Sequence, residues 1–324
     1  MTGRRSNQRG IALILVLLMV SIIVALTIQF NRSERAEIYE AANLSDGIRL
    51  RYVAQSAFYA AEAILLTDKN LYDALTEDWA KTDMLALASE GLFDNASFSL
   101  LIEDEGGKIP INLLISGNNY NMPIRDLVLR LLTGPYFRLS QRQAEELIDA
   151  IKDWIDADDE VTGDGAEGGY YAGRDRPYAA KNASLDCIEE LLMVKGISRE
   201  LFYGTRERAG LVQCLAVFGG GTINVNTAPV AVLRALSAEM TDEAVKRLDE
   251  YRREAKNDLA DPAWHSRIPG VTGLNIPQGL ITTRSDTFRI TAVGLHGRMM
   301  ERIIGIVKRD TSGKKVKLLS WKVE

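Results

Sequence analysis

Seven carboxylates occur within fifteen residues in the segment DWIDADDEVTGDGAE, from Asp153 to Glu167, which contains no lysine or arginine. So many like charges repel one another unless a cation or a basic neighbour compensates them. We take Asp156 as the first position of a loop. Asp158, Glu160 and Glu167 then fall at the third, fifth and twelfth positions, where a calcium loop of EF-hand type places oxygen ligands. The segment therefore predicts a calcium site.

The match to the calcium-loop pattern is partial. Val161 stands at the sixth position, where a glycine normally makes the turn, so the turn must differ from that of an EF-hand. A solvated acidic loop without a bound ion is the alternative interpretation. We expect a structural role for the ion, because calcium is plentiful outside the cytoplasm and weak sites fill there. The candidate ligands are Asp156, Asp158, Asp159, Glu160 and Glu167.

The same loop contains a glycine pattern, GxGxxG, formed by Gly163, Gly165 and Gly168. A dinucleotide site requires a strand before this pattern and a helix after it. A bound phosphate would also lie close to Asp164 and Glu167, which carry the same sign of charge. We therefore do not expect a nucleotide site.

The chain begins with a segment that predicts membrane insertion. Three arginines, Arg4, Arg5 and Arg9, precede a run without ionisable residues from Ile11 to Asn31. Twenty such residues in a helix span about 30 Å, the thickness of the hydrocarbon core of a bilayer. The arginines predict that the amino terminus stays in the cytoplasm, so the remaining chain is exported.

The helical pattern does not end at the membrane. Apolar and small residues continue to recur every three or four positions from Ile38 to Leu66, and no proline occurs before Pro110. This spacing predicts one helix from Ile11 to about Thr67 with an amphipathic outer half. An anchor alone does not need this length, so the outer half must pack on a domain or on a neighbouring protein.

A basic leader that ends in glycine directly before an apolar helix resembles the type IV pilin class, in which a prepilin peptidase cleaves after that glycine. Here cleavage would separate Gly10 from Ile11, leaving 36 basic and 44 acidic side chains, a net charge of −8. Most members have a glutamate at the fifth mature position, where this chain has Leu15. A buried carboxylate needs the amine of an adjacent subunit as its partner. A subunit without the acid can therefore occupy the end of a filament.

The Leu15 departure, together with the segments DWIDADDE, GGYY and INVNTAPVAVL, resembles the minor pseudopilin K family of type II secretion systems. The resemblance extends over nearly the whole chain. It implies a methylated, single-pass inner-membrane protein with a periplasmic body that binds calcium, caps the tip of the pseudopilus and helps to initiate its assembly. The implied partners are minor pseudopilins I and J, pseudopilin H, the major pseudopilin and the prepilin peptidase. The exported cargo and contacts with the outer-membrane channel stay open.

The expected fold class is α+β. Residues 96–102 and 109–115 are expected to form a hairpin, and residues 287–295, 300–308 and 316–323 three further strands. A pilin-like core of the long helix and a small antiparallel sheet is then interrupted by a helical insert that resembles SAM and helix–hairpin–helix domains. The expected divisions are a leader at 1–10, a membrane helix at 11–30, first core segments at 31–117, the insert at 118–278 and last strands at 279–324.

Two segments of the insert, Leu185 to Ile197 and Ile223 to Val271, resemble helix–hairpin–helix modules, whose hairpin amides bind nucleic acid phosphates. They motivate an alternative function, a DNA-binding minor pilin of a DNA-uptake system. Residues 141–240, however, contain 17 acidic and 10 basic side chains, which weakens any phosphate contact. We expect no nucleic acid partner, and a scaffold role for both segments.

The remaining reactive residue types do not suggest catalysis. Cys187 and Cys214 lie 27 residues apart, and either a disulfide or two buried thiols would suit an oxidising compartment. Paired acids such as Asp158 and Glu160 could serve a calcium-dependent hydrolase, but no aromatic sugar platform accompanies them. We therefore expect that the protein is not an enzyme.

Overall fold

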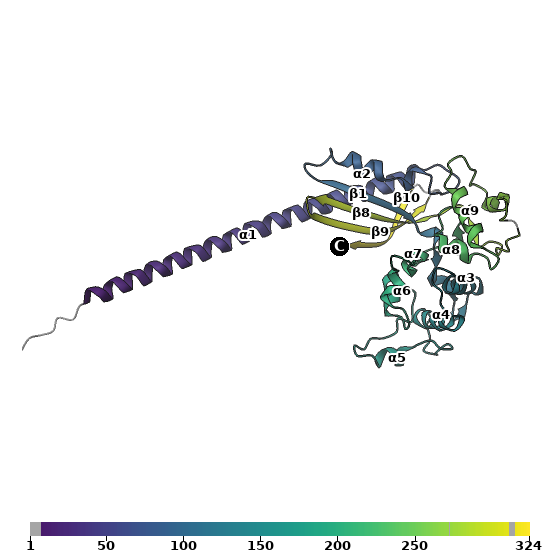
Figure 1. Ribbon diagram of the computed structural model, residues 1–324, viewed down its shortest axis with the longest axis horizontal. Coiled ribbons are helices and arrows are strands. Elements are labelled where there is room, and N and C mark those ends of the chain that lie inside the picture. Colours follow the sequence, from purple (N-terminus) through teal and green to yellow (C-terminus); the bar gives the residue numbers. More distant parts are fainter. Residues whose placement is uncertain (1–7, 272, 311–314) are drawn as a thin grey trace, which may run out of the picture.

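A computed structural model describes residues 8–271, 273–310 and 315–324. The first described element is one continuous helix, α1 (Gln8–Thr67), of 60 residues, which confirms the long helix expected from the sequence. At 1.5 Å per residue it measures about 90 Å, and its first half projects far from the rest of the molecule (Figure 1). Within Gly10–Thr67 it is long and apolar enough to cross a membrane, by length and composition. Residues 1–7 of the expected leader lie outside the described residues.

The last part of α1 packs on a four-stranded antiparallel sheet of order β1-β8-β9-β10. The strands are β1 (Ser97–Asp104), β8 (Thr287–His296), β9 (Met299–Asp310) and β10 (Lys315–Val323). Leu50, Phe58 and Leu65 of α1 are fully or almost fully buried against this sheet. Gly294 of β8 permits the close approach, since a Cβ there would collide with the carbonyl oxygen of Leu50. The three expected C-terminal strands are thus present, and the fold class is α+β as expected.

The hairpin expected at residues 96–102 and 109–115 is wrong. β1 pairs with β8, whereas β2 (Ile109–Pro110) pairs in parallel with β5 (Leu215–Ala216). The turn η2 (Glu105–Gly107) redirects the chain, and Ile109, Ile111 and Leu114 are buried in the core of the helical domain. A short apolar run has the same pattern whether a sheet or helices cover it, which explains the error. The remaining elements here are η3 (Ile111–Leu114), β3 (Ile115–Ser116) and β4 (Asn119–Tyr120).

The connection between α1 and β1 covers the outer edge of the sheet. It contains η1 (Asp78–Ala80) and α2 (Asp83–Ser89). The Ser89 hydroxyl accepts a hydrogen bond from the backbone N–H of Phe98 (3.0 Å), and the Thr82 hydroxyl donates to the carbonyl of Leu100. These hydroxyl groups form hydrogen bonds with backbone N–H and C=O groups of the edge strand β1 that would otherwise be unpaired.

A helical domain lies between β1 and β8, at the end of the molecule remote from the start of α1 (Figure 1). Its helices pack around one hydrophobic core, which confirms the helical insert. Two short parallel pairs, β2 with β5 and β6 with β7, join it to the sheet domain. The elements are α3 (Met122–Thr133), α4 (Gln141–Ile155), α5 (Gly168–Ala172), η4 (Ile188–Met193), α6 (Arg199–Tyr203), α7 (Leu211–Cys214), β6 (Ile223–Asn224), α8 (Val230–Ala235), α9 (Asp242–Arg252), η5 (Pro262–Arg267) and β7 (Ile281–Thr282).

Candidate cation site and domain junction

The acidic loop starts at the C-terminal end of α4. A capping box formed by Ser140 and Gln143 fixes the start of this helix. Its apolar face, which includes Leu147, Ile151 and Trp154, is buried in the domain core. The helix therefore holds its last residues, and the loop that follows Asp156, at a fixed place on the domain.

Three of the five candidate ligands come together. Oxygens of Asp156, Asp158 and Glu167 lie within 4.8 Å of one another. Asp156 and Glu167 are buried, yet Oδ1 of Asp156 and both carboxylate oxygens of Glu167 have no hydrogen-bond partner. Burial and the neighbouring carboxylates raise the pKa of Glu167 to about 7. Buried carboxylate oxygens without a partner are costly, and oxygens of this kind suit a hard cation such as calcium.

The other two candidate ligands lie outside this cluster. Glu160 is exposed, and Asp159 accepts a hydrogen bond from the side-chain amide of Asn182 (2.9 Å). The same amide donates to the carbonyl of Asp158 (2.8 Å), and the Oδ1 of Asn182 is buried without a partner. Asn182 adopts a positive φ of 48°, which asparagine tolerates better than most residues. Because Asn182 lies outside the acidic segment in the sequence, no sequence pattern indicates this contact.

Two carboxylates of α4 hold the loop from beneath. Asp153 accepts from the backbone N–H of Thr162 (3.1 Å), and Asp149 accepts from that of Asp164 (3.2 Å). Gly163 and Gly165 lie so close to these carboxylates that a Cβ on either would collide with one. These two glycines therefore allow the backbone of the loop to lie close to α4.

Two lysines also bind the loop. Lys152 of α4 pairs with Oδ2 of Asp156 and donates to the hydroxyl of Thr162 (2.8 Å). Lys195, at the tip of the first hairpin-like segment, donates to the carbonyls of Asp164 (2.9 Å) and Gly165 (3.0 Å). The basic side chain of this hairpin is therefore engaged with the protein's own acidic loop.

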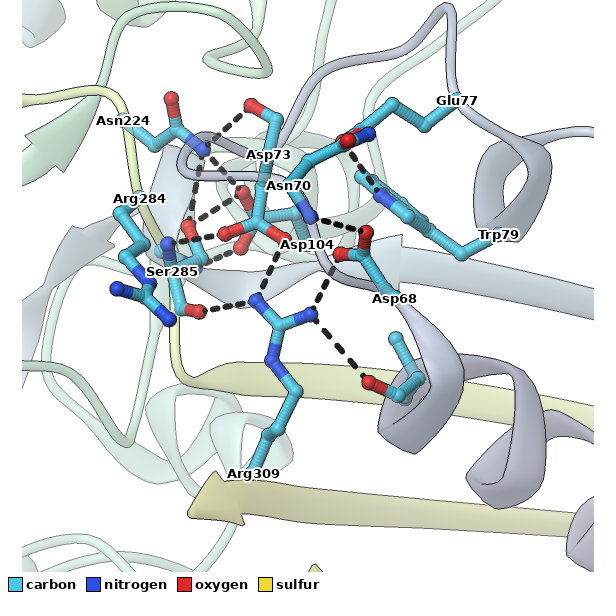
Figure 2. A network of polar contacts seen from close by, with 12 residues as sticks. Asp68, Asn70, Asp73, Glu77, Trp79, Asp104, Asn224, Arg284, Ser285 and Arg309 are labelled. Carbon is cyan, nitrogen blue, oxygen red and sulfur yellow. Dashed lines mark hydrogen bonds and ion pairs between the residues drawn. The ribbon is translucent and has the colours of Figure 1, made fainter. Parts of the chain in front are cut away.

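A second group of acids, Asp68, Asp73 and Glu77, lies in the segment that follows α1 and is paired differently. Figure 2 shows Arg309 reaching from β9 to Asp73 (2.5 Å) and Asp68 (2.9 Å). Glu77 accepts hydrogen bonds from the side chains of Asn70 and Trp79. Because an arginine and hydrogen-bond donors already satisfy these carboxylates, this group does not fit a metal ion as the first cluster does.

Two polar residues of the INVNT segment, Asn224 and Thr227, lie at the junction between the two domains, and Figure 2 shows Asn224 there. Oδ2 of Asp104, at the end of β1, accepts hydrogen bonds from Asn224 (2.9 Å), Thr227 (2.6 Å) and Ser285 (2.6 Å). Asn224 also donates to the carbonyl of Asp73 (3.1 Å). The segment thus ties the helical domain to the sheet and to the end of α1, a role that the sequence did not reveal beyond its turn-forming asparagines.

The two cysteines are not joined. Cys187 is exposed and Cys214 is buried, and both are free thiols in the structure. Burial raises the pKa of the Cys214 thiol to about 12, so it stays protonated at neutral pH. Of the two alternatives considered from the sequence, the disulfide is absent here, and only one of the two thiols is buried.

Comparison with known proteins gives consistent matches. Two family models, both described as "Type II secretion system (T2SS), protein K", match residues 107–206 and 223–284, together half of the chain. Both matched segments lie within the helical domain and its junction with the sheet.

Relatives cover nearly the whole chain. Type II secretion system protein K of Aeromonas hydrophila is 26% identical, covering 96% of both chains. The protein of that name from Pectobacterium carotovorum subsp. carotovorum is 28% identical, covering 95% of this chain and 98% of its own. A chain in the crystal structure of the GspK-GspI-GspJ complex from the enterotoxigenic Escherichia coli type 2 secretion system is similar in fold. Its TM-score is 0.70 at 17% identity, covering 88% of this chain and 99% of that one.

Proposed function

Because the chain belongs to the type II secretion system protein K family, we propose that it is the minor pseudopilin that caps the tip of the periplasmic pseudopilus and helps to initiate its assembly. The main support for this proposal is the exposure of the first part of α1, from Gly10 to Ser45, which we call the stem. From Gly10 to Ser45 every residue is exposed, including the uncharged run from Ile11. An apolar stem without partners in its own chain requires lipid or the helices of other subunits to cover it.

The position at the tip follows from two features. Leu15 at the fifth mature position makes no demand for the amine of a preceding subunit, so a missing neighbour leaves no carboxylate unpaired. The helical domain lies at the end remote from the stem and extends to one side of the sheet (Figure 1). A domain of this size suits the end of a filament better than its shaft.

We propose minor pseudopilins I and J as direct partners, since the similar chain comes from a complex with those two proteins. The test is copurification of a fragment starting at Asn31 with soluble I and J. Of the omitted part, every residue from Gly10 to Phe30 is exposed, and neither hydrophobic core includes any of them, so both cores are retained. A ternary complex of equal stoichiometry supports the proposal. If the fragment elutes alone at micromolar concentrations of both partners, the proposed partnership is wrong.

The DNA-uptake alternative is less favoured by the contacts of the two hairpin-like segments. Lys195 of the first binds loop carbonyls, as described above. In the second, Arg247 donates to the carbonyl of Pro269 (2.7 Å) at the hairpin tip. Basic groups engaged in this way are not free for phosphate. A mobility shift at low salt tests the alternative, and saturable micromolar binding of DNA by the fragment would support it.

We also propose that the acidic loop binds calcium in a structural role, with Asp156, Asp158 and Glu167 as ligands. The three unpartnered buried oxygens of Asp156 and Glu167 support this assignment. When bound, the ion would neutralise these carboxylates and join the end of α4 to the end of the loop. We expect the fragment to melt at a lower temperature in chelator than in calcium, and an unchanged transition would count against the site.

The proposed orientation places the amino terminus in the cytoplasm and both folded domains in the periplasm. This follows from the arginines before Ile11 and from the apolar run of α1. The role assigned to the protein is assembly of the filament, and it requires no catalytic step. Catalytic turnover that is lost on replacing Asp158 or Glu160 would contradict this assignment and favour the calcium-dependent hydrolase.

A further inference from the structure

We propose that Lys152, at the end of α4, acts as a built-in positive charge that partly neutralises the acidic loop. Its ammonium group keeps the loop close to its folded shape when calcium is absent, and it weakens calcium binding by opposing the charge of the ion. This inference rests on the proposed calcium site and concerns how that site is regulated. Lys152 is not itself a ligand, and its charge would limit how strongly the helical domain responds to calcium.

The first support is the position of the side chain. Lys152 is 8% exposed, and the carboxylate of Asp156 with which it pairs is fully buried. Its ammonium group also donates to Thr162 (2.8 Å), so one group joins the last turn of α4 to the middle of the loop. A buried lysine carries a large desolvation cost that only a close negative charge offsets. The buried ammonium group of Lys152 and the buried carboxylate of Asp156 therefore stabilise each other.

The second support is the distribution of partners among the ligand oxygens. Lys152 occupies Oδ2 of Asp156, whereas Oδ1 of the same carboxylate and both oxygens of Glu167 have no hydrogen-bond partner. Among the described residues, the pair of Lys152 and Asp156 is the only salt bridge to one of the three proposed ligands. One positive charge thus compensates part of a site that has three carboxylates. The uncompensated remainder is available to an ion.

The two effects of this charge have opposite consequences. Without calcium, the ammonium group reduces repulsion among Asp156, Asp158 and Glu167 and so favours the closed loop. With calcium, it lies next to an ion of the same sign, and calcium affinity depends on the net charge of the ligand set. Removing the charge should therefore loosen the ion-free loop and strengthen calcium binding at the same time.

The test compares Lys152→Met with the wild type, using the full chain in detergent. Melting temperatures are measured in chelator and in saturating calcium, and calcium affinity is measured by isothermal titration calorimetry. We expect a lower melting temperature in chelator, a larger rise on adding calcium, and calcium affinity about tenfold higher than in the wild type. Lys152→Arg keeps the charge and should behave like the wild type in chelator.

Lys108→Met is the control for a buried lysine outside the loop. Lys108 is also 8% exposed and pairs with a buried carboxylate, Glu105 (2.7 Å), away from the loop. Its replacement should lower the melting temperature equally with and without calcium. A general loss of packing in Lys152→Met would give the same result as this control.

The outcomes separate the two proposals. If calcium shifts Lys152→Met and the wild type by the same amount, or if affinity is unchanged or weaker, the role of Lys152 is wrong and the calcium site stands. If the wild type itself neither binds calcium nor shifts, the site is wrong. Should Lys152→Met fail to fold in chelator, folding restored by calcium supports the inference, and failure in both conditions overturns it.

Discussion

The junction at the end of α1 depends on a single buried guanidinium. Arg309 is 3% exposed and forms ion pairs with Asp68 and Asp73, as Figure 2 shows. It also donates to the backbone carbonyl of Ser285 (2.9 Å). Removing one partner of a buried ion pair leaves an uncompensated charge and typically costs about 3–5 kcal/mol. We predict a loss of that order in the free energy of unfolding for Arg309→Met at pH 8.

The loss should depend on pH in a defined direction. Burial, opposed in part by Arg309, already raises the pKa of Asp73 to about 6. Without Arg309 this pKa rises further, so the carboxyl group takes up a proton more readily and the buried charge disappears. A group whose pKa is raised on folding contributes stability below its unfolded pKa and loses it as pH rises through the folded value. The penalty of Arg309→Met should therefore be smaller at pH 5.5 than at pH 8.

The assay is urea unfolding of the fragment starting at Asn31, followed by tryptophan fluorescence and circular dichroism at both pH values. The matched control is Arg253→Met. Arg253 also pairs with an aspartate, Asp249 (2.8 Å), but is 57% exposed, so its loss should cost less than about 1 kcal/mol. If Arg309→Met and Arg253→Met lose the same small amount of unfolding free energy, the junction does not depend on this buried network.

Three further predictions concern the loop and the sheet. Glu167→Gln should abolish the rise in melting temperature on adding calcium, and a rise equal to that of the wild type would remove Glu167 from the ligand set. In chelator, wild-type stability should fall as pH rises through about 7, because the pKa of Glu167 is raised to about 7 on folding, and this slope should flatten in Glu167→Gln. Gly294→Val should destabilise the sheet domain by about 1–3 kcal/mol, because the new side chain meets the carbonyl of Leu50. Gly91 faces open space, so Gly91→Ala should not destabilise the domain. Equal chemical denaturation midpoints for the two variants would contradict this prediction.

Long and regular patterns in the sequence were sufficient to predict part of the fold. The period of α1 extends over many turns, and the C-terminal strands alternate clearly, so both were predicted. The sequence predicts a hairpin strand over residues 109–115, which is wrong, because an apolar run does not reveal what covers it. Its partner, β5, lies about a hundred residues away and has no local signature.

The site was predicted to a similar extent. Charge density located the acidic loop, and spacing selected Asp156, Asp158 and Glu167, which do come together. The same spacing included Glu160, which is exposed, because the loop does not follow the EF-hand turn. The contact of Asn182 with the loop depends on tertiary packing, as does the network of Arg309 at the junction, so neither has a periodic signal in the sequence.

We propose that this chain is a processed pseudopilin, and the mass of its amino-terminal peptide shows whether the leader has been removed. The protein is isolated from membranes of cells that contain a prepilin peptidase, and intact-mass and peptide spectrometry are applied. We predict a mature chain that starts at Ile11 and lacks Arg4, Arg5 and Arg9, with a net charge of −8 in place of −5. A chain that still carries Gly10 and the residues before it would show that the leader is not removed and that the protein is not a processed pseudopilin.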